Sequence, residues 1–224
     1  MITANVISRT FHIKYGSGTG TCFTIDIDSK QYFVTAKHVI DNLKDGDEIE
    51  IYYQNKWVKI KTKLIGHSVN ADVSVFAIDL HIGGHPLPAT IDGIIYGQDL
   101  YFLGFPYGIK SEIGALNREF PLPLVKKGIF SAMFFDQLGK YFLIDGHNNP
   151  GFSGGPVVYK NPNSNDFNVG GIISAYRYEL ENTYLNDNPT PIQIKTNTGI
   201  VIAYSIDNAL EIINQNPNGK ATTV

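Results

Sequence analysis

Apolar and polar residues alternate in short stretches through the first third of the chain, a period typical of β-strands with one buried face. Two pairs of these stretches are separated by short polar turns, at Asp28-Ser29-Lys30 and Gln54-Asn55-Lys56, so each pair predicts a β-hairpin. The five predicted strands are Thr21–Ile27, Gln31–Thr35, Glu48–Tyr53, Trp57–Leu64 and Asp72–Leu80. The segment Ala36–Leu43, which follows the second of them, has room for one or two helical turns.

Short strand-like stretches also dominate the rest of the chain. They are Leu100–Leu103, Lys127–Ala132, Tyr141–Ile144, Pro156–Tyr159, Val169–Tyr176 and Ile200–Ala203. Ser205–Gln215 carries a capping serine and apolar residues at helical spacing, which predicts an amphipathic helix. The polar, turn-rich segment Arg177–Thr198 predicts a functional loop or a partly mobile one, and Asn216–Val224 predicts a frayed tail.

This order of elements bears on the fold class. Many short strands joined by turns favour barrels or sandwiches over βαβ units. The segment His81–Thr90 is rich in Gly and Pro and is the best candidate for an interdomain linker. We therefore expect an N-terminal barrel in residues 1–85 and a C-terminal barrel in residues 86–224, the second followed by the helix.

Composition narrows the functional classes. The 224 residues carry a formal net charge of −3 without a basic block, so nothing supports a nucleic-acid partner. Cys22 is the single cysteine, which excludes an intramolecular disulfide and fits a reducing compartment. The first residues show neither a signal peptide nor a membrane-spanning stretch, so we expect a cytoplasmic protein without membrane contact.

The run Asn149–Pro156 carries the strongest chemical signal. It contains Ser153 between glycines and prolines, a composition that builds a tight exposed turn with backbone N–H groups on one side. Acyl transfer needs this combination of a hydroxyl nucleophile and donors for the oxyanion. Two segments upstream, Tyr32–Val39 (YFVTAKHV) and Ala71–Phe76 (ADVSVF), supply a histidine and an aspartate in the order His, Asp, Ser.

Together these three segments resemble the chymotrypsin-like (trypsin-like) serine proteases, and most closely compact bacterial members without disulfides, such as the protease domain of the high-temperature-requirement family. The resemblance extends from about Gly16 to Asn214, and Gly16–Phe23, Asp99–Gly108 and Gly170–Tyr176 also match. It implies an all-β fold of two antiparallel six-stranded β-barrels with a short C-terminal helix. The first barrel would carry His38 and Asp72, and the second would carry Ser153.

The resemblance also implies roles for these residues. Ser153 would be the nucleophile, His38 the general base and Asp72 the group that orients His38. Asp79 and Asp92 fit the aspartate position less well. The N–H groups of Gly151 and Ser153 would form the oxyanion hole.

One position departs from the family pattern. Phe152 stands where the family usually has Asp or Asn, which argues against activation by a freed N-terminus, so packing or another trigger must order the oxyanion hole.

Substrate-binding residues follow from the same resemblance. His147, six residues before the nucleophile, would lie at the base of the specificity pocket, followed by Asn148. Ser174 would lie near Asp72, and the backbone of Ser174, Ala175 and Tyr176 would pair with an extended peptide. No carboxylate stands at the pocket base, which argues against cleavage after Lys or Arg, and Tyr176 replaces a glycine and narrows the entrance.

Other residue clusters point to no metal or phosphate site. The acidic cluster at Asp41, Asp45, Asp47 and Glu48 misses the spacing of a calcium loop, and His81 and His85 lack a third ligand. We expect no metal and no cofactor. The expected partners are a protein or peptide substrate and a regulatory protein.

Three interpretations remain open at this point. The first is a serine endopeptidase, and the second is a latent or inactive pseudoprotease that binds extended peptides. The third is a structural β-protein in which the motifs coincide by chance, and it predicts that His38 and Ser153 lie far apart.

Overall fold

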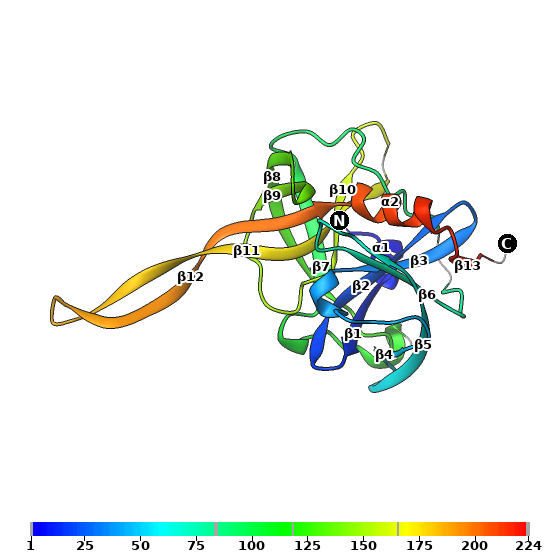
Figure 1. The fold of residues 1–224 in the computed structure, drawn as a ribbon, viewed down its shortest axis with the longest axis horizontal. Coiled ribbons are helices and arrows are strands. Elements are labelled where there is room, and N and C mark those ends of the chain that lie inside the picture. Colours follow the sequence, from blue (N-terminus) through cyan, green and yellow to red (C-terminus); the bar gives the residue numbers. More distant parts are fainter. Residues whose placement is uncertain (1, 83–84, 118, 165, 223–224) are drawn as a thin grey trace.

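In the computed structural model the alternation of apolar and polar residues in Glu48–Tyr53 becomes an alternation of buried and more exposed side chains, whereas Lys30–Thr35 and Ser74–Ile78 are buried on both faces. The model describes residues 2–82, 85–117, 119–164 and 166–222, so Gly83 and Gly84 of the predicted linker lie outside the described residues. Two β-barrels pack side by side, and a long two-stranded arm extends from one of them (Figure 1).

Six antiparallel strands form the first barrel. They are β1 (Thr10–Tyr15), β2 (Gly18–Ile27), β3 (Lys30–Thr35), β4 (Glu48–Tyr53), β5 (Lys56–His67) and β6 (Ser74–Ile78). Their order is β3-β2-β1-β4-β5-β6, and pairing of β3 with β6 closes the ring. Asp28 and Ser29 both adopt left-handed backbone conformations, so the β2–β3 turn has two residues and Lys30 already belongs to β3.

The second barrel is closed in the order β10-β11-β12-β9-β8-β7. Its strands are β7 (Asp99–Gly104), β8 (Leu124–Asp136), β9 (Gly139–Asp145), β10 (Pro156–Lys160), β11 (Phe167–Leu185) and β12 (Asn188–Ser205). The predicted fold class, two antiparallel six-stranded barrels with a C-terminal helix, is confirmed.

Short helices and one short strand complete the fold. They are α1 (Ala4–Ser8), η1 (Lys37–Val39), η2 (Pro106–Gly108), η3 (Gly114–Asn117), α2 (Asp207–Gln215) and β13 (Lys220–Ala221). The predicted helical segment after β3 is a single 3-10 turn, η1. No helix in the described part of the chain combines the length and apolar character needed to span a bilayer.

Two expectations about irregular segments were wrong. Arg177–Thr198 is not a loop, because β11 and β12 continue through it and pair from Gly171↔Ser205 out to Leu185↔Asn188. The tail is not frayed up to residue 222, because β13 pairs with β3 and Lys220 forms an ion pair with Asp79 at 2.5 Å. In both cases backbone pairing compensates for a sequence with few apolar residues.

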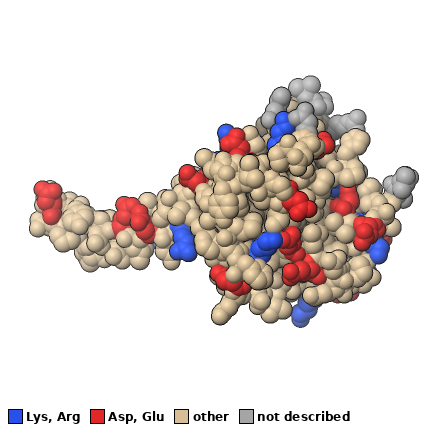
Figure 2. All heavy atoms as spheres, turned by 90° about the horizontal axis from the view of Figure 1, so that it is seen from above, with Lys and Arg blue, Asp and Glu red and all other residues tan. Residues whose placement is uncertain are grey.

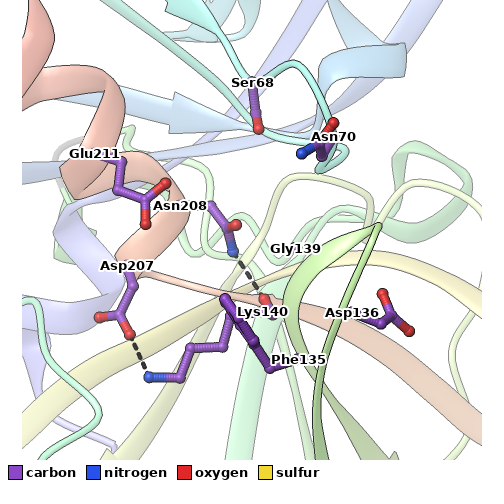
Figure 3. Close-up of a pocket in the computed structure, with 9 residues that line it drawn as sticks. All are labelled: Ser68, Asn70, Phe135, Asp136, Gly139, Lys140, Asp207, Asn208 and Glu211. Carbon is purple, nitrogen blue, oxygen red and sulfur yellow. Dashed lines mark hydrogen bonds and ion pairs between the residues drawn. The ribbon is translucent and has the colours of Figure 1, made fainter.

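Helix α2 joins the two barrels. Its buried side chains Ala209, Ile212 and Ile213 belong to the core cluster that contains residues of both barrels. On its other side, Asn208 Nδ2 donates to Lys140 O at 2.8 Å, and Lys140 Nζ lies 2.7 Å from Asp207 Oδ2. Figure 3 shows these bonds in the polar pocket between α2 and the β8–β9 turn, where they hold the helix against the second barrel.

His12 also links the two barrels. Its ring stacks on Phe105, which follows β7, with centroids 5.0 Å apart, and meets the edge of Trp57 at 4.8 Å. Only 5% of His12 is exposed. Burial, together with the positive charges of Lys110 and Lys14, lowers the pKa of His12 from 6.5 to about 4.

This lowered pKa predicts a loss of stability in acid. The unfolded chain binds the His12 proton near pH 6.5 and the folded chain only near pH 4, so stability falls as the pH drops through this interval. The interval corresponds to as much as about 3 kcal/mol in the free energy of unfolding. His12→Phe keeps an aromatic ring at the interface but has no group that titrates there. Its free energy of unfolding, measured with urea, should therefore fall less between pH 7 and pH 4 than that of the wild type. Equal pH dependence in both proteins would contradict the assignment.

Candidate active site

The structure brings His38 and Asp72 into direct contact. Asp72 precedes β6, and η1 presents His38 at the end of β3. His38 Nδ1 lies 2.6 Å from Asp72 Oδ2, and the His38 backbone N–H donates to Asp72 Oδ1 at 2.9 Å. Because a carboxylate only accepts, Nδ1 carries the proton and Nε2 is free to act as a base.

Ser174, on β11 of the second barrel, contacts the same carboxylate. Its hydroxyl donates to Asp72 Oδ2 at 2.5 Å. Asp72 therefore receives three donors, two from the first barrel and one from the second. This network ties the ring of His38 to both barrels.

The charge states of this pair follow from these contacts. The hydrogen bond with Asp72 raises the pKa of His38 against the opposing effect of burial. Burial acts to raise the pKa of Asp72, but the hydrogen bonds and charge of His38 and the hydrogen bond from Ser174 together hold it below its ordinary value. Asp72 is consequently an anion at neutral pH, and a proton on His38 is stabilised.

Ser153 lies in the same cavity as His38 and Asp72. The cavity has a volume of about 540 Å³ and is lined by His38, Asp72, Asn148, Asn149, Pro150, Ser153, Ser174, Ala175, Tyr176, Tyr178 and Lys195. In this structure the Ser153 hydroxyl donates to Ser174 O at 3.2 Å rather than to His38. The expectation of a chance coincidence, which required His38 and Ser153 to lie far apart, is therefore wrong.

Backbone geometry orients the N–H group of Gly151. The Tyr107 N–H donates to Pro150 O at 2.9 Å, and in a trans peptide the following N–H points the opposite way, away from Tyr107. Gly151 has a φ of +104°, and a Cβ there would approach Phe105 O to 2.5 Å, so this position accepts only glycine.

Burial of the Phe152 side chain holds the Ser153 turn in place. This side chain is fully buried and meets Phe102 edge-to-face with ring centroids 5.1 Å apart. The sequence left open whether packing orders this turn, and burial of Phe152 supplies such packing. The ring lies in the core of the second barrel and therefore does not cover the cavity.

Thr21, on β2, fastens the Ser153 turn to the first barrel. Its N–H donates to Ser153 O at 2.8 Å, and its Oγ1 donates to Gly151 O at 2.8 Å. The same Oγ1 accepts the N–H of Phe105 at 3.2 Å. A Cβ on Gly154 would collide with the carbonyl oxygen of Thr21, so only glycine allows this approach.

The predicted substrate-binding residues fall into two groups. Asn148, Ser174, Ala175 and Tyr176 line the cavity, and Asn148 Nδ2 donates to Ala175 O at 3.3 Å. His147 is exposed and does not belong to the lining residues. In the described part of the chain, no group of three or more His, Cys, Asp or Glu side chains is arranged to hold a metal ion.

Besides Thr21, three residues at the site escaped the sequence analysis. Tyr178 and Lys195 line the cavity from the arm, with Lys195 Nζ 4.5 Å from the centre of the Tyr178 ring. Lys126 Nζ binds His147 O and Asn149 Oδ1, both at 2.6 Å, and so supports the chain that leads to Ser153. Partial burial lowers the pKa of Lys126. Alternation alone identifies strands, but it does not indicate which lysine or tyrosine faces a cleft.

Comparison with known proteins places this geometry in a family. Residues 18–163 match the family model of the trypsin-like peptidase domain. No curated protein sequence matches the chain significantly.

Solved structures share the fold at low sequence identity. The HtrA-type protease AlgW with a tripeptide has a TM-score of 0.62 and 24% identity, over 95% of this chain and 62% of that one. A mutant of Rv3671c from M. tuberculosis in its inactive form has a TM-score of 0.63 and 15% identity, over 96% and 89%. The serine endoprotease from Yersinia pestis has a TM-score of 0.60 and 20% identity, over 94% and 63%. This chain thus spans less than two thirds of the AlgW and Yersinia pestis chains.

The contacts of Thr21 predict a specific defect in Thr21→Val. Loss of the Oγ1 bonds to Gly151 and Phe105 leaves buried backbone groups unpaired and should cost about 1–3 kcal/mol of folding free energy. Hydrogen exchange measured by mass spectrometry should accelerate at the amides of Phe105 and Tyr107. The matched control is Thr62→Val, which loses one hydrogen bond to Asp47 O inside the first barrel. Equal protection of both amides in the two variants would exclude the proposed role of Thr21.

Proposed function

The chain belongs to the trypsin-like peptidase domain family, and on this premise we propose that it is a serine endopeptidase with His38, Asp72 and Ser153 as its catalytic triad. The observation that carries the proposal is the 2.6 Å contact between His38 Nδ1 and Asp72 Oδ2 in a cavity that also contains Ser153. This contact leaves Nε2 unprotonated and turned to accept a proton.

The proposed reaction proceeds through an acyl-enzyme. Ser153 Oγ attacks the carbonyl carbon of the scissile peptide while His38 Nε2 takes the hydroxyl proton. His38 then passes this proton to the leaving amine, and the C–N bond breaks. A water molecule attacks the ester, again giving its proton to His38, and Ser153 recovers its hydrogen as the acid product leaves.

The groups around the triad have supporting roles in this proposal. The N–H groups of Gly151 and Ser153 stabilise the negative oxygen of the tetrahedral intermediates. Asp72 stabilises the imidazolium that forms on His38 in each half-reaction, and the bond from Ser174 keeps Asp72 in place. The reaction as proposed uses no metal and no cofactor.

A specific observation favours a second candidate, a latent protein that binds extended peptides without cleaving them. The Ser153 hydroxyl donates to Ser174 O, so cleavage first requires rotation of the serine side chain towards His38. The two candidates differ in whether Ser153 is activated in the purified protein. A regulatory partner, expected from the sequence, would act on this step.

Covalent labelling separates the two candidates. We expect a fluorophosphonate to add once per molecule of the purified protein, seen by intact mass, and to be lost in Ser153→Ala and in His38→Ala. The control Ser164→Ala, at an exposed loop serine, should label like the wild type. An unlabelled but folded wild type would refute the endopeptidase proposal and favour the latent candidate.

The raised pKa of His38 predicts the pH profile of cleavage. The base form of His38 is required, so kcat/KM for a peptide should rise with pH to a plateau, with a midpoint above 6.5. Asp72→Asn removes the cause of this shift and should lower kcat by about four orders of magnitude.

The matched control for this prediction is Asp79→Asn. Asp79 is an exposed aspartate just beyond β6 that pairs with Lys220 and has no bond to His38. Its profile should follow that of the wild type. A midpoint below 6.5 in the wild type would show that another group limits the reaction.

A further inference from the structure

The outer half of β11 forms an arm with β12 that is tied to the second barrel at its base, where Asn197 Nδ2 donates to Asn148 O at 2.8 Å. From Tyr178 to Leu185 the strand pairs only with Asn188–Asn197 of β12, and the ribbon extends far from the body (Figure 1). Isolated two-stranded ribbons are marginally stable in water. Yet the arm exposes more than half of the surface of Tyr178, Leu180 and Tyr184. Such a ribbon gains stability when a third strand joins it.

One edge of the arm is open for such a strand, and it starts at the active site. Up to Ile172, β11 pairs with β10 on one edge and with β12 on the other. Beyond that residue, within the described part of the chain, its strand pairing is with β12 alone. Ser174 O, at the start of the open edge, accepts the hydroxyl of Ser153 at 3.2 Å. The edge therefore leads from the nucleophile towards the tip of the arm, and near its start Asn148 Nδ2 donates to Ala175 O at 3.3 Å.

The two faces of the arm differ in chemistry. In the register of the ribbon, Leu180 stands opposite Lys195 on the face where Lys195 also covers the Tyr178 ring. Tyr178 and Lys195 line the cavity, so this face, which carries Tyr178, Leu180 and Lys195, continues the cleft. The opposite face carries Glu179 and Glu181, and Figure 2 shows acidic side chains standing out along the arm.

We propose that the arm is a docking strand for the substrate, which lies along the open edge of β11 as a third, antiparallel strand. This proposal rests on the endopeptidase function. In an antiparallel arrangement the residues on the amino side of the scissile bond run from Ser174 towards Leu185. At about 3.4 Å per residue, the eight residues from Tyr178 to Leu185 extend the substrate contact by roughly 27 Å.

The faces of the arm define the class of substrate. Side chains of the added strand that lie beside Tyr178 and Leu180 are apolar, and those that lie beside Glu179 and Glu181 are basic, because neighbouring strands interact through paired side chains. The substrate is thus an extended polypeptide segment with alternating apolar and basic residues, located several residues before the cleavage site.

The test compares peptides that share one cleavable sequence. The short peptide has four residues before the scissile bond, and the long one has twelve, the added eight alternating Val and Lys. In the trimmed variant, Glu181–Ile194 is replaced by Asn-Gly between Leu180 and Lys195, which are already cross-strand partners, so the lining residues Tyr178 and Lys195 stay.

We expect the wild type to cleave the long peptide with a kcat/KM at least tenfold above that of the short peptide. The trimmed variant should cleave the short peptide at the wild-type rate and lose the advantage of the long one. Alternate residues of an added strand turn their N–H groups towards β11, and the residues between them turn theirs away. N-methylation of the first set should therefore abolish the advantage of the long peptide, and N-methylation of the second set should leave it unchanged. No advantage in the wild type, or an advantage that survives trimming, would overturn the proposal.

Charge reversal tests the substrate class separately. In Glu179→Arg/Glu181→Arg the preference for the Val-Lys segment should change to a preference for a Val-Glu segment. The matched control Glu211→Arg, an exposed position on α2, should keep the original preference. An unchanged preference in the double variant would refute the assigned chemistry.

Binding measurements keep the docking proposal separate from catalysis. If neither peptide is cleaved, the endopeptidase function fails, and fluorescence anisotropy of the labelled long peptide with Ser153→Ala still tests the arm. Affinity at least tenfold above that of the trimmed Ser153→Ala protein supports docking, and equal affinity refutes it. Dimerisation in analytical ultracentrifugation that disappears on trimming would assign the edge to a second copy of the chain and also refute it.

Discussion

The Ser153 turn depends on a single threonine of the other barrel. Thr21 binds the carbonyls of Gly151 and Ser153 and accepts the N–H of Phe105, so two segments of the second barrel, the Ser153 turn and the chain after β7, meet one residue of the first. Asp72 makes the reciprocal connection, because it belongs to the first barrel and accepts the hydroxyl of Ser174 from the second. The relative position of the barrels and the geometry of the site are therefore one and the same constraint.

Packing orders one part of this site, and hydrogen bonding orders another. The ring of Phe152 is buried in the core of the second barrel, which fixes the position of the Ser153 turn relative to that core. The hydrogen bond from the Tyr107 N–H to Pro150 O then fixes the orientation of the peptide group between Pro150 and Gly151, and with it the direction of the Gly151 N–H. Neither contact requires an ionisable group, so titration of His38 removes neither of the two contacts that order the proposed oxyanion hole.

The sequence predicted the elements whose patterns are local. The alternation of Glu48–Tyr53 and the spacing of Ile206, Ala209, Leu210 and Ile213 identified a strand and a helix, because one face of each is buried. The arm could not be identified in this way. Both of its faces are exposed to solvent, so Arg177–Thr198 has no alternation of apolar and polar residues that would indicate a strand. Strand β13 is held by backbone bonds that carry no side-chain signature.

At the site, the sequence identified residues but not their present orientation. His38, Asp72 and Ser153 stood out because their neighbours form recognisable motifs. The choice of Ser153 Oγ between His38 and Ser174 O depends on a side-chain rotation that no motif encodes. Thr21 and Lys126 were missed because they act through backbone carbonyls more than one hundred and about twenty residues away, respectively.

The helix α2 and the segment after it have a consequence for biosynthesis. Asn216 binds Ile65 O across 151 residues, and Lys30 binds Pro217 O across 187 residues. During translation, β1–β6 therefore leave the ribosome long before Asn216 and Pro217, which bind them, have been synthesised. Until the second barrel has been translated, the first barrel lacks these C-terminal contacts, and a nascent chain that ends before it also lacks Ser153 and Ser174, which line the cavity together with His38 and Asp72.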